Sequence, residues 1–239
     1  MREDRDRAQR CQTPEQRAIT ATVMSRAIAL GASGFALTGS TARKRRTTIS
    51  DLDYHVIGIR PDVSDLPGDV DVVATTPARF RSRLMEGDDF AQWTLRCGCI
   101  LYDTSPMRDG VRLIVEMGLW PNAQRKLDSL DVHRTEVERL IQMGDQGAAH
   151  EQLRAMLTTA ARGLLLHARV FPLARKELPA QLERAGHGPL ARALRRVIHA
   201  TPQLPELEAG LQVLDDTLEA LRAPLPASGW AHPREQTLV

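Results

Sequence analysis

A chain of 239 residues is long enough for one large or two small domains, and with 42% hydrophobic residues it can form a real core rather than stay disordered. Lysine and arginine number 32 against 30 for aspartate and glutamate, which leaves a formal net charge of only +2. This near balance argues against a dedicated nucleic-acid-binding protein, because such proteins usually carry a marked basic excess.

The cysteines and the apolar segments indicate a protein of the cytoplasm. Cys11, Cys97 and Cys99 are odd in number, and the last two are too closely spaced for a common zinc site, so we expect three reduced thiols. The N-terminal segment is charged and lacks the apolar stretch of a signal peptide. No segment approaches the roughly 20 apolar residues that a membrane helix needs, so we expect no membrane partner.

The chain begins with a charged segment and a well-marked helix. Residues 1–12 are polar, and we expect them to be frayed. A helix is then predicted to start with Thr13 as its N-cap, Pro14 at its first position and Gln16 completing a capping box.

Short apolar runs next predict the strands of a sheet. These runs lie at residues 35–38, 52–59, 69–74 and 100–103. Between the third and fourth runs, Thr76 and Pro77 predict another capped helix start, and a helical pattern resumes at residues 90–96. The first half of the chain should therefore be a mixed α and β domain.

Strand signals stop after about residue 108, and the pattern becomes purely helical. Long stretches with helical periodicity follow, roughly at residues 122–144, 147–169, 175–199 and 205–222. We therefore expect a mixed domain at residues 1–120, an α-helical bundle at residues 121–224 and a tail at residues 225–239. The predicted fold class is α+β, with a small mixed sheet followed by a helical bundle.

Acidic residues alternate at the start of two predicted strands. Asp51 and Asp53 are two residues apart, so both side chains point to the same face of the strand. Neighbouring carboxylates repel each other unless a cation neutralises them, and Mg²⁺ prefers oxygen ligands. Asp69 and Asp71 repeat this spacing, so a third carboxylate would come within reach if the two strands pair. Two metal ions shared by such carboxylates can activate a hydroxyl and stabilise a leaving phosphate.

A turn with the chemistry of a phosphate site precedes these carboxylates. Gly39 lets the backbone approach a ligand closely, and backbone N–H groups together with the Ser40 hydroxyl can hold phosphate oxygens. Arg43 begins a basic run, residues 43–46, whose charge would complement a triphosphate or pyrophosphate. Each feature alone is common in turns and on solvated surfaces, and it is their order and spacing that make the signal.

The combined pattern resembles the DNA polymerase β-type nucleotidyltransferase superfamily. An apolar strand ending in Gly39-Ser40 is separated by ten residues from Asp51-Leu52-Asp53 at the start of the next strand. The segment Thr41-Ala42-Arg43 is close to the version found in minimal nucleotidyltransferases, with Lys44 where those often have glycine. The helical second half resembles the bundles of aminoglycoside nucleotidyltransferase-like proteins.

The resemblance implies transfer of a nucleoside monophosphate from an NTP, with ATP as the expected donor and Mg²⁺ as cofactor, to an acceptor hydroxyl with release of pyrophosphate. It assigns catalysis and metal binding to Asp51, Asp53 and Asp71, and nucleotide binding to Gly39, Ser40 and Arg43. Asp71 is preferred to Asp69 because it lies inside an apolar run, whereas Asp69 borders a Pro-Gly loop.

The acceptor stays open, since a small hydroxylated molecule, a protein side chain and an RNA 3′ end are all compatible. A homodimer is also compatible with the sequence. The alternative of a different class is a non-catalytic nucleotide-binding protein or a toxin–antitoxin component with the same fold.

Other candidate residues have simpler interpretations. Arg162 and His167 match the spacing of HEPN-type ribonucleases, but such spacing arises easily by chance in an apolar helix. His55 shares the strand face of the two aspartates, and we interpret it as a structural histidine. Glu151 is a candidate base on the acceptor side, with no geometry to support it.

Overall fold

The computed structural model describes residues 2–43, 51–67, 69–128, 130–199 and 204–222. The chain divides into two compact units, unit 1 at Met1–Pro121 and unit 2 at Asn122–Val239. Each unit has hydrophobic clusters of its own.

Within its described residues, unit 1 contains a four-stranded mixed sheet in the order β3-β2-β1-β4. The strands are β1 (Gly34–Leu37), β2 (Leu52–Ile57), β3 (Val70–Thr75) and β4 (Cys99–Asp103). β1 runs antiparallel to β2 and β4, whereas β2 and β3 are parallel. The four predicted strands and the α+β class with a small mixed sheet are confirmed.

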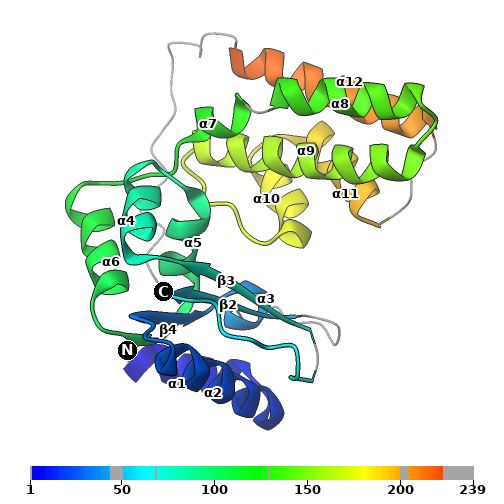
Figure 1. Ribbon diagram of the computed structural model, residues 1–239. Helices are drawn as coiled ribbons and strands as arrows, with labels where there is room; N and C mark the ends of the chain where they lie inside the picture. The colour runs from blue at the N-terminus through cyan, green and yellow to red at the C-terminus, as the bar shows by residue number, and fades with distance from the viewer. Residues whose placement is uncertain (1, 44–50, 68, 129, 200–203, 223–239) are drawn as a thin grey trace. The chain divides into compact units, whose positions relative to one another are not determined.

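Helices cover both faces of this sheet (Figure 1). One face carries α1 (Arg2–Cys11) and α2 (Pro14–Ala29), and the other carries α4 (Pro77–Met85), α5 (Asp89–Cys97) and α6 (Pro106–Glu116). Because side chains alternate along a strand, β2 contributes to two separate cores. Tyr54 and Val56 pack in the cluster that includes α1 and α2, and Ile57 packs with Phe80 and Leu84 of α4.

The helix starts marked by local capping signals are present as predicted. Thr13 Oγ1 accepts the backbone N–H of Gln16 at 3.2 Å, and the Gln16 side chain accepts the backbone N–H of Thr13 at 3.1 Å. Thr76 caps α4 in the same way, through the backbone N–H of Arg79. Such caps satisfy backbone donors that the first turn leaves without partners.

The expectation that residues 1–12 are frayed is wrong, because α1 occupies most of this segment. Its polar side chains make contacts with β4, far away in the sequence. Arg5 Nε donates to the carbonyl of Leu101 at 3.2 Å, and Arg7 Nε donates to the Cys99 thiol at 3.0 Å. Ala8 is also buried in the core shared with α2. A charged segment thus folds through a few long-range contacts that its composition does not reveal.

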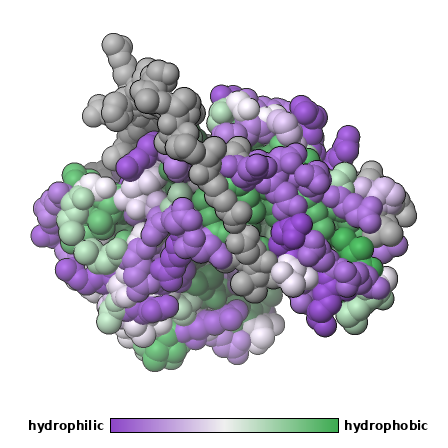
Figure 2. Space-filling model, turned by 90° about the horizontal axis from the view of Figure 1, so that it is seen from above, coloured by the Kyte–Doolittle hydropathy of each residue, from purple (hydrophilic) through white to green (hydrophobic). Residues whose placement is uncertain are grey.

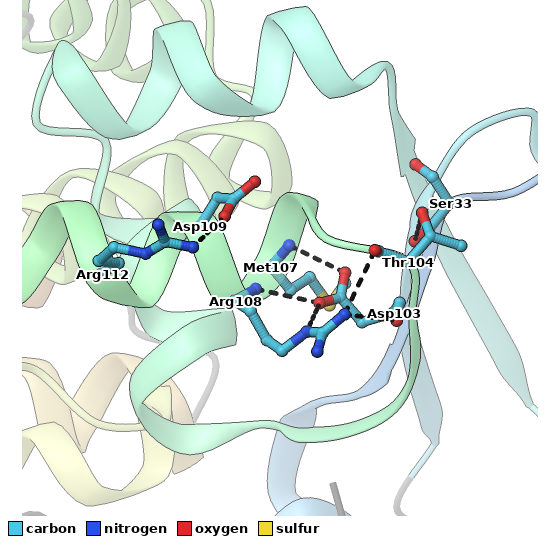
Figure 3. Close-up of polar contacts among 7 residues, drawn as sticks. All are labelled: Ser33, Asp103, Thr104, Met107, Arg108, Asp109 and Arg112. Carbon is cyan, nitrogen blue, oxygen red and sulfur yellow. Dashed lines mark hydrogen bonds and ion pairs between the residues drawn. The ribbon is translucent and has the colours of Figure 1, made fainter.

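The sequence pattern also did not predict α6, which follows β4 almost directly. Asp103, at the end of β4, has a fully buried carboxylate that accepts the backbone N–H groups of Met107 and Arg108 at 3.0 and 3.1 Å (Figure 3). Arg108 Nε also donates to this carboxylate at 3.1 Å. The backbone N–H of Thr104 donates to the Ser33 carbonyl at 2.8 Å. Asp103 therefore fixes the turn from the sheet into α6.

Replacing Asp103 with alanine is expected to lower the free energy of unfolding by about 2–3 kcal/mol, because two backbone donors and a guanidinium lose a buried acceptor. Urea unfolding followed by circular dichroism measures the loss. Asp109→Ala, in the first turn of α6, is the matched control, since the partly exposed Asp109 carboxylate pairs with Arg112 and should contribute less than about 0.5 kcal/mol. Equal losses in the two variants would contradict this role of Asp103.

Unit 2 is helical throughout its described residues. Its elements are α7 (Ala123–Leu127), α8 (Leu130–Gln142), α9 (Gln146–His167), the 3-10 turn η1 (Arg175–Glu177), α10 (Leu178–Arg184), α11 (Gly188–His199) and α12 (Leu204–Arg222). The long helix α9 lies among α8, α10, α11 and α12, and its Leu153, Leu157 and Leu165 are fully buried (Figure 1). The predicted change from a mixed α and β half to a purely helical half is confirmed.

The boundaries of two predicted helical stretches in unit 2 differ from the structure. The stretch predicted at 122–144 is divided into α7 and α8, and the stretch predicted at 175–199 is divided into η1, α10 and α11. Gly186, with φ +84°, lies between α10 and α11, where glycine ends a helix at low cost. The tail predicted at residues 225–239 lies outside the described residues.

One face of the molecule carries mostly polar residues (Figure 2). Figure 2 shows hydrophilic residues over much of one face, with hydrophobic residues among them. In the part of the chain that the structure describes, no helix has the length and apolar character needed to cross a bilayer.

Candidate functional site

The turn after β1 is built around a close contact between Gly39 and Asp53. Gly39 starts the short helix α3 (Gly39–Ala42) with φ +67°, a conformation that favours glycine. A Cβ atom at this position would lie 1.7 Å from Asp53 Oδ2. Glycine is therefore required because the carboxylate of Asp53 lies directly against the backbone of the turn. The sequence had suggested close approach of a ligand, whereas in the structure the approaching group is this carboxylate.

Hydrogen bonds hold the start of β2 against this turn. The backbone N–H and the hydroxyl of Thr38 both donate to the Asp53 carbonyl, at 2.8 and 3.2 Å. The hydroxyl of the buried Thr41 donates to the carbonyl of Asp51 at 3.4 Å. The backbone of the Asp-x-Asp segment is thus fixed by the residues on either side of Gly39 and Ser40.

The pairing of β2 with β3 brings a second carboxylate beside Asp53. The two strands are parallel, and Asp53 pairs in register with Asp71. Paired residues point to the same face, and neighbouring strands lie about 4.8 Å apart. Asp69 lies one position before β3, where its carbonyl accepts the backbone N–H of Leu52 at 2.8 Å. The register therefore favours Asp71 over Asp69 as the neighbour of Asp53.

This arrangement disfavours the ionised form of the Asp53 carboxyl. Burial, together with the negative charges of Asp51 and Asp71, raises its pKa to about 6. Asp51 lies just before β2 and is exposed, as is Asp71. A cation beside these groups would relieve both the repulsion and the desolvation. A strongly shifted carboxyl with specific charged neighbours is typical of functional sites.

The three carboxylates do not form a finished metal site. Among the residues that the structure describes, no group of three or more His, Cys, Asp or Glu side chains is arranged to hold a metal ion. Asp53 and Asp71 are neighbours by register, and Asp51 lies within electrostatic range of Asp53. Their oxygen donors suit Mg²⁺, so a bound ion would require these side chains to rotate toward one another.

The other predicted nucleotide-binding residues lie along α3. Ser40 is half-buried and follows Gly39 directly, and Arg43 is half-buried at the C-terminal end of the helix. The rest of the basic run, residues 44–46, lies outside the described part of the chain.

His55 is enclosed by the helices that cover the Asp53 face of the sheet. Its ring nitrogens lie 2.9 Å from the Thr94 hydroxyl and 3.2 Å from the Thr75 hydroxyl. The ring also packs against Phe80 and Phe90, with centroids 5.5 and 5.1 Å apart. Burial, with a smaller effect of Arg83, lowers its pKa to about 4. These contacts support the interpretation of His55 as a structural histidine.

His55 and Asp53 should have opposite effects on stability as the pH falls. The folded-state pKa of His55 is about 4, below its usual 6.5, so acidification protonates the unfolded state first and stability is lost between these values. The folded-state pKa of Asp53 is about 6, above its usual 3.8, so acidification protonates the folded state first and stability is gained. Each effect should amount to about 1–2 kcal/mol between pH 7 and pH 5.

Single variants should separate the two effects in urea unfolding at pH 7 and pH 5 with EDTA present. Relative to the wild type, His55→Gln should become more stable on acidification, because only the gain from Asp53 remains. Asp53→Asn should become less stable, because only the loss from His55 remains. If the variants keep the wild-type difference in unfolding free energy between pH 7 and pH 5, these assignments are wrong.

Three arginines of unit 2 come within electrostatic range of one another. Desolvation and the positive charges of Arg154 and Arg162 on α9 lower the pKa of Arg175. Glu151 opposes this shift and forms an ion pair with Arg154. Arg154 and Arg162 lie about two turns apart on α9 and Arg175 begins η1, and no motif marks the three together. Their proximity depends on how η1 packs in the folded unit.

The pair Arg162 and His167 does not share one face of its helix. Both lie on α9, with Arg162 half-buried and His167 exposed. Residues five apart on an α-helix are about 140° apart around its axis. The two side chains therefore leave different faces of the helix, which disfavours the nuclease interpretation.

Comparisons with known proteins give a distant likeness among solved structures. No protein-family model matches the sequence, and no curated protein matches it. Among solved structures, the chain is similar to a nucleotidyltransferase-like protein from Exiguobacterium sibiricum 255-15, whose crystal structure was determined at 1.90 Å resolution. The sequence identity is 16% and the TM-score 0.45, over 87% of this chain and 75% of that chain.

Proposed function

We propose that this protein is a Mg²⁺-dependent nucleotidyltransferase, which moves a nucleoside monophosphate from an NTP to an acceptor hydroxyl and releases pyrophosphate. ATP is the expected donor. The observation that carries the proposal is the position of the Asp53 carboxylate, which lies against Gly39 and next to Asp71 in the strand register. This arrangement joins a turn suited to phosphate with a group of carboxylates suited to a divalent cation.

Asp51, Asp53 and Asp71 are the residues that would hold Mg²⁺. The bound metal would neutralise phosphate charge and lower the pKa of a hydroxyl oxygen. Asp53 supplies the central carboxylate, because its backbone is fixed by Thr38. The raised pKa of Asp53 supports this role, since a cation compensates the cost of keeping it ionised.

The remaining residues would bind and orient the substrates. The backbone N–H groups of the turn at Gly39 and the hydroxyl of Ser40 would hold phosphate oxygens, with Arg43 supplying positive charge. Asp71 is exposed and adjoins Asp53, so it can accept the proton of an incoming hydroxyl. Catalysis of this kind depends on positioning and charge neutralisation.

The test is an incubation of the protein with Mg²⁺ and each of four NTPs labelled at the α-phosphate, with cell extract as the source of acceptors. We expect Mg²⁺-dependent transfer of label to a small molecule, a protein band or RNA, which also identifies the acceptor class. Reactions with EDTA are the control. Absence of both transfer and Mg²⁺-dependent NTP binding would overturn the proposal, and binding without transfer would favour the non-catalytic alternative.

A further inference from the structure

Two cysteines from distant parts of the chain meet at one backbone oxygen in unit 1. Cys11 is the last residue of α1 and Cys99 is the first residue of β4. The sulfur of Cys11 lies 4.0 Å from the carbonyl oxygen of Ala42, and the sulfur of Cys99 lies 3.8 Å from the same oxygen. Since both sulfurs are within 4.0 Å of a single atom, they cannot be more than twice that distance apart.

The two thiols differ in environment in a way that suits a stepwise reaction. Cys11 is partly exposed at the end of a helix, whereas Cys99 is fully buried. Burial raises the pKa of Cys99, but Arg7 Nε donates to its sulfur at 3.0 Å and favours the thiolate. The electrostatic interaction of Cys11 with Cys99 is a further sign of their proximity. An external reagent should therefore reach Cys11 first, and Cys99 should react second from within.

We propose that Cys11 and Cys99 are a redox-active pair that forms a reversible disulfide with a low-molecular-weight disulfide such as oxidised glutathione. A disulfide needs its Cβ atoms about 4 Å apart, and rotation of the two side chains can bring together sulfurs that already share one neighbouring oxygen. The bond would join the end of α1 to the start of β4 beside Ala42. Because Ala42 ends the helix that begins at Gly39, the crosslink would fix the backbone next to the candidate site.

The reaction balances as two thiol–disulfide exchanges. The Cys11 thiolate attacks one sulfur of oxidised glutathione, the glutathione S–S bond breaks, and one glutathione leaves as a thiolate that takes up a proton. The Cys99 thiolate then attacks the Cys11 sulfur of the mixed disulfide and releases the second glutathione. Two protein thiols are oxidised, and one glutathione disulfide is reduced to two glutathione molecules.

Cys97 provides the matched control. It is partly exposed and lies two residues from Cys99, but it interacts electrostatically with Arg96. Cys97 ends α5, and Gly98 alone separates it from Cys99 at the start of β4. If exposure alone decided reactivity, Cys97 would pair with Cys11 as readily as Cys99 does. The structure instead places Cys99 against the oxygen that Cys11 contacts.

The experiment treats the reduced full-length protein with oxidised glutathione, blocks the remaining thiols with iodoacetamide, and maps the digested protein by mass spectrometry without reduction. We expect the wild type and Cys97→Ser to lose two hydrogens and to show a link between Cys11 and Cys99. Cys11→Ser should form no internal link, and Cys99→Ser should stop at a glutathione adduct on Cys11.

Thermal unfolding is the second measurement. A disulfide that closes the long loop between Cys11 and Cys99 should raise the unfolding midpoint of the wild type and Cys97→Ser by about 5 °C or more. Dithiothreitol should reverse the rise, and Cys11→Ser should show none. The absence of a Cys11–Cys99 link in the folded wild type and in Cys97→Ser would overturn the proposal, as would a link from Cys11 to Cys97. Neither readout depends on the proposed nucleotidyl transfer.

Discussion

Replacing Asp53 with asparagine should abolish nucleotidyl transfer and at the same time stabilise the metal-free protein at pH 8. Asparagine has nearly the same shape but no charge, so the variant loses the central carboxylate without creating a cavity. Transfer should fall by at least about 10²–10³-fold, as it does when an enzyme loses one electrostatic stabilising group. Stability should rise by about 1–2 kcal/mol, because the cost that raises the pKa of Asp53 to about 6 disappears.

The opposite signs of the two effects make this a sharp test. Label transfer is measured with Mg²⁺, and urea unfolding is measured at pH 8 with EDTA. Asp65→Asn is the control in the same unit, because the exposed Asp65 carboxylate pairs only at the surface with Arg26. It should leave transfer unchanged and alter stability far less than Asp53→Asn does, because exposed ion pairs contribute little. The assignment of Asp53 would be wrong if Asp53→Asn kept its activity.

Added Mg²⁺ tests the same site independently, through the thermal stability of the protein. In the wild type, it should raise the unfolding midpoint at pH 8, because an ion that binds the folded state stabilises it. In Asp53→Asn, the rise should be much smaller, whereas Asp65→Asn should behave like the wild type. A rise of equal size in Asp53→Asn would place the ion elsewhere.

Replacing Gly39 with alanine should also remove transfer, through displacement of the Asp53 carboxylate. The added Cβ would lie 1.7 Å from Asp53 Oδ2 and 2.6 Å from its Cγ, so this side chain must move. The φ of +67° adds strain of about 1–2 kcal/mol for a residue with a side chain. We therefore expect both a loss of stability and a fall in transfer of at least about 10²-fold.

Gly31→Ala separates these two consequences. Gly31 has a similar φ of +79°, but a Cβ there would meet no atom within 4 Å. It should cost about the same backbone strain and leave transfer at the wild-type rate. Transfer and urea unfolding of both variants are compared at a temperature where each is folded. Gly39→Ala with normal transfer would show that the contact with Asp53 does not position the carboxylate.

Local signals explain which parts of the fold could be predicted from the sequence. The starts of α2 and α4 depend on Thr13 and Thr76, whose side chains bond to backbone groups three residues away. Such bonds need no tertiary structure. By contrast, α1 depends on contacts such as that of Arg7 with Cys99, and the turn into α6 depends on burial of Asp103. No pattern within a short window contains that information.

From the sequence by itself, Asp51 and Asp53 are predicted to share one face, because side chains alternate along a strand. The sequence also showed that a Gly-Ser turn precedes them. Parity alone could not separate Asp69 from Asp71, and the apolar run around Asp71 favoured it only indirectly. The parallel register of β2 and β3 placed Asp71 next to Asp53. The need for glycine at position 39 and the raised pKa of Asp53 likewise come from the tertiary structure. Both depend on a close approach and a burial that exist only after the sheet has formed.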